Sequence, residues 1–183
     1  MRDESGQGAL LDSILFLVIM LVASTLVYVY GAGAFRVEAA VRQGDDLRFA
    51  SDALDSVLAS SLEKTSYKDI HGREIQLREK SVAELILSEF ALRRDGVPAS
   101  SFQGPGRIEQ SIEDQLGLLV APQYHFALHA TYLSGSLFLS DSIAGTAGLP
   151  HVRTAASTEL SLLAPSGVNQ AILVTLYLWR SVS

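Results

Sequence analysis

The sequence predicts an α+β fold, in which a long N-terminal hydrophobic helix continues as an amphipathic helix. That helix is expected to pack on a small head with two short helices and an antiparallel β-sheet. Three observations predict this class: an uncharged apolar stretch from Ser13 to Phe35, apolar residues at helical spacing after it, and alternating apolar and polar residues in the last third of the chain. Helices first and strands afterwards are typical of α+β domains.

Residues 9–35 form the apolar stretch, and Asp12 is its one charged residue. At about 1.5 Å of rise per residue, roughly twenty apolar residues span a bilayer core of about 30 Å. Tyr28 and Tyr30 lie near the far end of the stretch, where aromatic rings favour an interface. We therefore expect residues 9–35 to form a transmembrane or filament-core helix. The alternative is a buried core helix, although such helices are usually shorter.

The residues after Phe35 keep helical spacing, but charged side chains now interrupt them on one side. No proline occurs before Pro98, so nothing in the sequence forces the helix to end early. We expect one helix over roughly residues 9–64, with a coiled coil as the alternative explanation of its apolar stripe. The stripe recurs every three or four residues at Leu47, Ala50, Leu54, Val57, Leu58 and Leu62.

The sequence of residues 66–94 predicts a strand followed by a helix. Residues 66–80 are expected to form a turn at His71-Gly72 and a short alternating strand. Ser81 and Glu84 have the spacing of a capping box, which predicts a helix start at Ser81. This helix is expected to end near Arg94, because basic residues suit the C-terminal end of a helix dipole.

The last part of the chain predicts one more helix and a sheet. Apolar residues share one face of a short helix over residues 108–117, and from Pro122 the spacing changes to strict alternation. Two consecutive hairpins then imply an antiparallel sheet. The expected strands cover residues 124–132, 137–140, 154–162 and 168–179.

The length and composition of the chain limit its possible domain organisation and its possible binding partners. The 183 residues suit a polar leader over residues 1–8, the helix of residues 9–35 and a single head domain over residues 36–183. The net charge is −6 and the acidic residues are dispersed, so no nucleic-acid partner is expected. The chain has no cysteine, which excludes disulfides and thiol chemistry.

His125 and His129 are the one pair with metal-ligand spacing. Two histidines four residues apart share a face of a helix, but on the strand expected here they lie about 13 Å apart. No nucleophile-elbow, phosphate-loop or zinc-protease motif occurs in the sequence. We therefore expect no enzyme, no catalytic residue, no cofactor and no metal site.

The residues before the apolar stretch form a short polar leader that ends in small residues. A processing site at Gln7, Gly8 and Ala9 would leave the apolar helix at the mature N-terminus. This layout, with Asp12 in the first turn of the helix, resembles the class III signal of type IV pilins. Its Gly-Gln-Gly ending is most similar to the archaeal type IV pilin-like proteins, and TadE-like pseudopilins are near neighbours.

The resemblance implies a structural subunit of a type IV pilus-like filament. Its helix would be anchored in the lipid membrane before assembly and would then pack against copies of itself. A prepilin-type peptidase and an assembly platform would be its partners. The resemblance also implies that Asp12 pairs with the α-amino group of a neighbouring subunit. The alternative is that Asp12 lies at the membrane interface or favours the helix N-terminus through the dipole.

The expected location is a single-pass membrane protein with an outward head, which becomes an extracellular filament after assembly. One arginine, Arg2, precedes the apolar stretch, and three arginines follow it. By the positive-inside rule, this difference favours a cytoplasmic head instead. The alternative function is an anchored accessory or interaction module of a secretion or filament machine that does not polymerise. A membrane-tethered enzyme is a third alternative.

Overall fold

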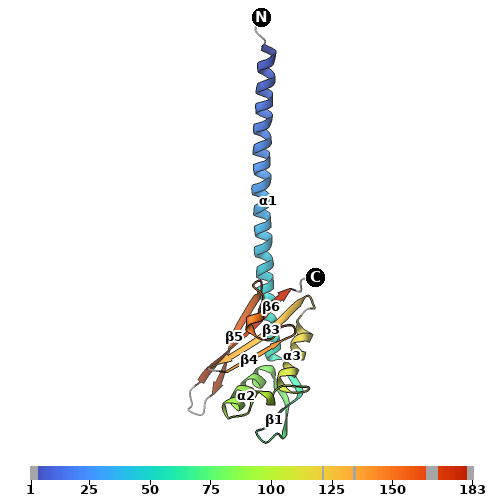
Figure 1. The fold of residues 1–183 in the computed structure, drawn as a ribbon, viewed down its shortest axis with the longest axis vertical. Coiled ribbons are helices and arrows are strands. Elements are labelled where there is room, and N and C mark those ends of the chain that lie inside the picture. Colours follow the sequence, from blue (N-terminus) through green and yellow to red (C-terminus); the bar gives the residue numbers. More distant parts are fainter. Residues whose placement is uncertain (1–3, 121, 134, 164–168, 181–183) are drawn as a thin grey trace. The chain divides into compact units, whose positions relative to one another are not determined.

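A computed structural model describes the backbone of residues 4–120, 122–133, 135–163 and 169–180. It describes the side chains of those residues except 4–13 and 31–42. The chain divides into two compact units, Met1–Asp45 and Asp46–Ser183, and each is described by itself below. The element labels are those of Figure 1.

The first unit contains most of the helix α1 (Glu4–Ala59), which spans 56 residues. Among the residues whose side chains are described, no helix is both long and apolar enough to cross a membrane. The predicted fold class, with residues 9–35 as a long hydrophobic transmembrane helix, is therefore wrong on this point. The predicted single-pass location in a lipid membrane does not fit this finding either. Within residues 9–35, the described side chains are those of residues 14–30.

The prediction that this helix runs to residue 64 is also wrong, because α1 ends at Ala59. Ser60 follows its last turn. The Ser60 N–H donates to the carbonyl oxygen of Ser56 at 3.0 Å, as in a helix, but its hydroxyl donates to the carbonyl oxygen of Val57 at 2.7 Å. Such a bond from a serine hydroxyl to the backbone competes with continuation of a helix. The chain then enters a strand, where pairing with a later segment decides its conformation.

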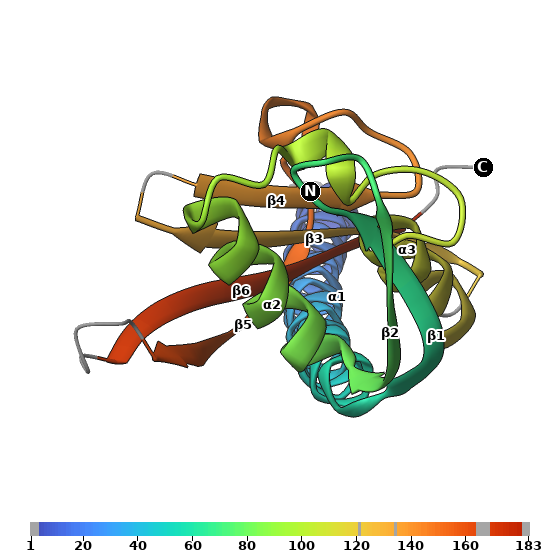
Figure 2. The ribbon, with the colours of Figure 1, turned by 90° about the horizontal axis from the view of Figure 1, so that it is seen from below.

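Four strands form an antiparallel sheet in the order β4-β3-β6-β5 (Figures 1 and 2). The two predicted hairpins, β3 with β4 and β5 with β6, are confirmed. The predicted turn at residues 164–167 and Ser134 of the other turn lie outside the described residues. The strands are β3 (Tyr124–Tyr132), β4 (Gly135–Ser140), β5 (Thr154–Leu163) and β6 (Asn169–Arg180).

A second, two-stranded sheet pairs β1 (Ser61–Lys68) with β2 (Glu74–Ser81), where the sequence predicted only one sheet. The predicted turn at His71-Gly72 is confirmed, with Gly72 at φ 77°. The Asp69 carboxylate holds this turn, because it accepts the backbone N–H groups of both His71 and Arg73 at 2.8 Å. A carboxylate that accepts N–H groups two and four residues ahead stabilises a tight turn.

The two predicted helices of the head are confirmed as α2 (Val82–Arg94) and α3 (Ile108–Leu119). The capping box of α2 is complete: the Glu84 N–H donates to the Ser81 hydroxyl at 3.2 Å, and the Ser81 N–H donates to the Glu84 carboxylate at 3.0 Å. Short 3₁₀ turns, η1 (Ala99–Ser101) and η2 (Thr146–Gly148), lie in the connecting loops.

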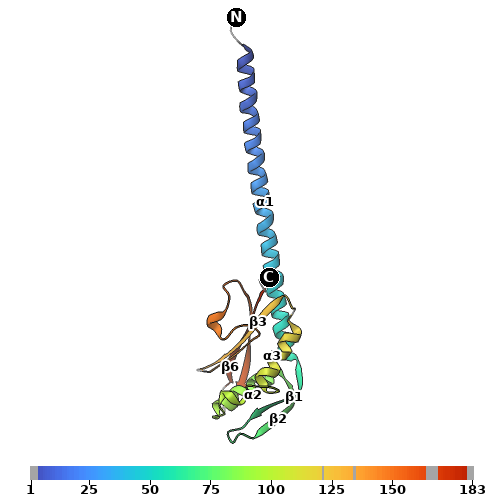
Figure 3. The same cartoon turned by 45° about the vertical axis from the view of Figure 1, so that its right-hand side comes forward.

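The core of the head lies on one face of the four-stranded sheet. Figure 3 shows α2, α3 and the β1–β2 pair on the same side of that sheet. The sheet contributes alternate residues, as the period of a strand requires. The C-terminal part of α1 contributes Ala50, Leu54, Val57 and Leu58 of the predicted stripe, whereas Leu47 is exposed and Leu62 lies on β1. Fully buried side chains include Val57, Leu85, Ile112, Leu128, Ile172 and Leu176.

A polar contact fixes the C-terminal part of α1 against the ends of two strands. The Tyr124 hydroxyl donates to the Asp46 carboxylate at 2.6 Å, and the Arg180 guanidinium donates to the same oxygen at 3.1 Å. Phe49 stacks on the Tyr124 ring, with centroids 5.3 Å apart. The hydrogen bond to Asp46 raises the pKa of Tyr124, because the ionised phenol could no longer donate. The contact joins residues far apart in the sequence.

Substitution of Tyr124 by Phe tests this contact. We expect Tyr124→Phe to lower the free energy of unfolding of the head by about 1–2 kcal/mol, because it removes a hydrogen bond to a charged acceptor. Urea unfolding should show a lower midpoint with an unchanged slope. Tyr177→Phe is the control, since that ring stacks on Arg153 without a described hydrogen bond of its hydroxyl. Equal losses in both variants would contradict the assignment.

Candidate functional site

The residues that the sequence singled out for function all lie at the start of α1. The backbone of Gln7, Gly8, Ala9 and Asp12 is helical. Their side chains lie outside the described residues, so the predicted processing site and the predicted role of Asp12 stay predictions.

The described apolar part of α1 is exposed along its whole length. Every large hydrophobic side chain from Ile14 to Tyr30 is at least half exposed, from 50% for Val18 to 77% for Tyr28. No charged residue interrupts this run. An apolar surface of this extent on a monomer marks an interaction site. We call residues 14–30 the apolar helix surface.

The two histidines lie on β3, as the alternation predicted, and each has its own neighbours. Nδ1 of His125 lies 2.9 Å from the Asp141 carboxylate. The His129 ring packs beside Phe138, with centroids 6.0 Å apart, and burial lowers the pKa of His129. Their different partners indicate that they do not act as a pair.

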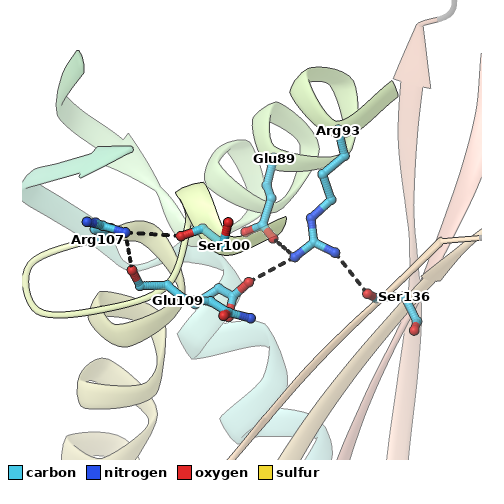
Figure 4. Close-up of polar contacts among 7 residues, drawn as sticks. Glu89, Arg93, Ser100, Arg107, Glu109 and Ser136 are labelled. Atoms are coloured by element: carbon cyan, nitrogen blue, oxygen red, sulfur yellow. Dashed lines mark hydrogen bonds and ion pairs between the residues drawn. The ribbon is translucent and has the colours of Figure 1, made fainter. Parts of the chain in front are cut away.

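The head contains a buried cluster of two acids around one arginine, drawn in Figure 4. Arg93 on α2 donates through one guanidinium nitrogen to Glu89, one turn before it, and to Glu109 on α3 at 2.8 Å. Through its other terminal nitrogen Arg93 donates to the carbonyl oxygen of Ser136 on β4 at 3.1 Å. The cluster therefore ties α2 to both α3 and the sheet.

Burial sets the charge of this cluster. The Glu89 side chain is 1% exposed and that of Glu109 is 11% exposed, so two ionised carboxylates would share one cation away from water. Burial raises the pKa of Glu89 to about 8, with Glu109 adding to the shift and Arg93 opposing it. Burial likewise raises the pKa of Glu109. A protonated Glu89 leaves Arg93 and an ionised Glu109 as a balanced pair.

The unpartnered atoms agree with this assignment. Within the described part of the chain, the second carboxyl oxygen of Glu89 is buried and accepts no hydrogen bond from a protein donor. Leaving such an oxygen without a partner costs much more for an ionised carboxylate than for a neutral carboxyl group.

A groove of about 380 Å³ lies beside the cluster, with Glu109 in its wall. One wall is the first half of α3, and the opposite wall is the end of β4 with the loop after it. The groove carries acidic and amide groups next to apolar ones. Its lining includes Gln103, Gln110, Glu113, Phe138, Ser140 and Ile143.

The sequence contains a signal for this cluster within α2. Glu89 follows Leu85 by four residues and Ile86 by three, so it falls on the apolar face of its own helix. A glutamate in such a position needs a partner, and Arg93 is one turn further on. Glu109 gave no comparable signal, because only the packing of α3 on α2 brings it to Arg93.

The cluster predicts a pH dependence of stability. The pKa of Glu89 is higher in the folded than in the unfolded protein, so the folded state binds more protons between its ordinary value, near 4.5, and about 8. Stability should therefore fall as the pH rises through this window, by on the order of a few kcal/mol. Glu89→Gln keeps the shape without the titration, so its unfolding free energy should vary much less with pH.

The measurement is urea unfolding of the wild type and Glu89→Gln at several pH values from 5 to 9. Glu74→Gln, an exposed position on β2, is the matched control and should follow the wild type. If Glu89→Gln shows the same fall as the wild type, another group causes it and the protonated state assigned to Glu89 is wrong.

Comparison with known proteins adds no relative to these observations. No family model matches the sequence, and no curated protein or solved structure is similar enough to count as a match.

Proposed function

We propose that this protein is a structural subunit that assembles with copies of itself into a pilus-like filament through the apolar helix surface. The observation that carries the proposal is the exposure of every large hydrophobic side chain from Ile14 to Tyr30. The N-terminal layout that resembles class III signals supports it, and so does the presence of a separate folded head after the helix.

Hydrophobic burial is the driving force that assembly would use. Full removal of a large apolar side chain from water contributes roughly 1.5–3 kcal/mol, and the apolar helix surface offers many such side chains. Copies of the same helix supply a matching apolar partner without any buried charge in residues 14–30. In this proposal the head domains lie outside the helical core, and the filament is extracellular.

The second candidate is an interaction module that does not polymerise. The groove between α3 and β4 favours it, because concave sites lined by apolar groups and a few polar ones are common binding sites. The two candidates differ in one observable. A filament subunit forms assemblies of its own chain without any added protein, whereas an interaction module stays a single copy until its partner is present.

A charge placed in the apolar helix surface tests the proposal. Val27 is 74% exposed, so Val27→Lys costs little in an isolated chain. In an assembly the lysine would be buried without a partner, which is strongly unfavourable. We expect the sedimentable fraction of the full-length chain to fall at least about tenfold, a loss of about 1.4 kcal/mol. Negative-stain microscopy should show the filaments disappear.

Val152→Lys is the matched control, since Val152 is an apolar residue of the head that is 89% exposed. It adds the same charge outside the apolar helix surface and should leave assembly within about twofold of the wild type. Equal loss in both variants, or no loss in either, would contradict assembly through residues 14–30.

Asp12 gives a separate test of the role that the resemblance implies. If its carboxylate meets the α-amino group of a neighbouring subunit inside the assembly, Asp12→Ala leaves that amino group unpaired at a cost of about 3–5 kcal/mol. Asp12→Glu keeps the charge and should be tolerated better. A role in the helix dipole alone is worth roughly 0.3–1 kcal/mol. The measurement is the ratio of assembled to unassembled chain, and equal ratios for wild type and Asp12→Ala would exclude the pairing.

A further inference from the structure

Strand β4 is an edge of the four-stranded sheet, and its outer side borders the groove. The strand order β4-β3-β6-β5 gives β4 a strand on one side only (Figure 2). Phe138 and Ser140, near the end of β4, line the groove. Whether this edge can accept another strand depends on which backbone groups point into the groove.

Three contacts settle that direction. The Phe126 N–H donates to the Asp141 carboxylate, and the Phe126 carbonyl oxygen accepts the Ser140 hydroxyl, so both backbone groups of Phe126 point toward β4. By the alternation of antiparallel ladders, Leu128 also points toward β4 and pairs with Leu139. Phe138 and Ser140 then direct their backbone groups away from β3. The Ser136 carbonyl oxygen, two residues before Phe138, also points away from β3, because it accepts a hydrogen bond from Arg93.

These outward groups are unused in the head. Among the described residues, no hydrogen bond reaches the backbone N–H or carbonyl oxygen of Phe138 or Ser140 from outside the β3–β4 pair. An unpaired edge of this kind is a template for strand addition, in which an incoming extended segment supplies the missing backbone partners.

The opposite wall of the groove is acidic. Helix α3 carries Glu109, Glu113 and Asp114 and no basic residue. Glu109 is engaged by Arg93, but within the described residues Glu113 forms no ion pair. Burial and the neighbouring acids Asp114, Asp141 and Glu109 raise the pKa of Glu113. An incoming segment with a basic side chain would relieve this repulsion.

We propose that the groove accepts strand β2 of a second copy of this chain, which adds to the free edge of β4 and places Arg78 against Glu113. Two other sheet edges of the described head are candidates for this contact, β2 and β5. Charge distinguishes them: the one charged residue of β5 is the acid Glu159, which the acidic wall would repel, whereas β2 carries two basic residues, Arg78 and Lys80, besides Glu74 and Glu79.

The hairpin that presents β2 fits this role. Residues 61–81 hold all three lysines of the chain and two arginines, against four acids, a net charge of +1 in a chain of −6. Arg78 is exposed and has no described ion pair. On the other side of the hairpin, β1 is bridged to Arg107 at Ser66, which leaves β2 as the open edge.

The contact is heterologous, because two different surfaces meet. Such contacts repeat into open filaments when the rotation does not close a ring. The inference rests on the proposed function, self-assembly of the chain. It adds a contact between two head domains to the contact between helices. The two can fail separately, because the apolar helix surface and the groove lie in different units.

Cross-linking of the full-length chain tests the contact, and the absence of native cysteine makes introduced thiols unique. Ser140→Cys protein, labelled with nitrogen-15, is mixed with unlabelled Gln76→Cys protein and treated with a short bismaleimide. Mass spectrometry separates mixed from same-variant pairs. Mixed pairs should form at least about fivefold more than in a mixture of Ser140→Cys with Ser161→Cys, which tests the β5 edge. Equal yields in the two mixtures would overturn the proposal.

A charge exchange then tests the pairing of Arg78 with Glu113. Glu113→Arg in the Ser140→Cys protein should lower the yield about fivefold, and Arg78→Glu in the Gln76→Cys protein should restore it to within about twofold. Glu159→Arg in the Ser140→Cys protein is the matched control and should change nothing. Failure of the rescue overturns the proposal. Sedimentation of the same mixtures reports on the proposed function: sedimented chain without the mixed cross-link rejects the head contact alone.

Discussion

The head depends on one apolar contact, between the C-terminal part of α1 and the inner face of the four-stranded sheet. Ala50 and Val57 of the helix have no exposed surface, and neither have Leu128 and Leu176 of the sheet. Helices α2 and α3 complete the same core from the sides. Because such interiors are close-packed, none of these elements can shift without opening a cavity. The hydrogen bond from Tyr124 to Asp46 closes the contact at its polar end.

The buried acids are the exception to this apolar core, and they occur where three elements meet. Arg93 reaches Glu89 on its own helix, Glu109 on α3 and the backbone of β4. A buried cluster of this kind contributes little to stability compared with an apolar one, but it fixes geometry, because each group needs its partner. Here Arg93 holds Glu109 in the wall of the groove, whereas Glu113, one turn later, forms no ion pair among the described residues.

Local patterns predicted most of the head, and non-local contacts explain what they missed. Alternation predicted the four strands, and Ser81 with Glu84 predicted the start of α2, because these signals are read within a few residues. The helix end at Ala59 was missed because Leu62 continues the apolar spacing, whereas pairing of Leu62 with Lys80 makes it a strand. Glu109 meets Arg93 only through the packing of two helices, which no spacing in the sequence encodes.

The two apolar parts of α1 differ in a way that bears on assembly. The stripe at Ala50, Leu54 and Val57 occupies one face of the helix, and the core of the head covers it within the chain. In the apolar helix surface, consecutive residues from Ile14 to Val22 are all exposed and apolar, so they surround the helix on every side. A single partner helix covers only one face. If the surface is buried by copies of itself, each helix therefore needs several neighbours, which a filament core supplies and a dimer does not.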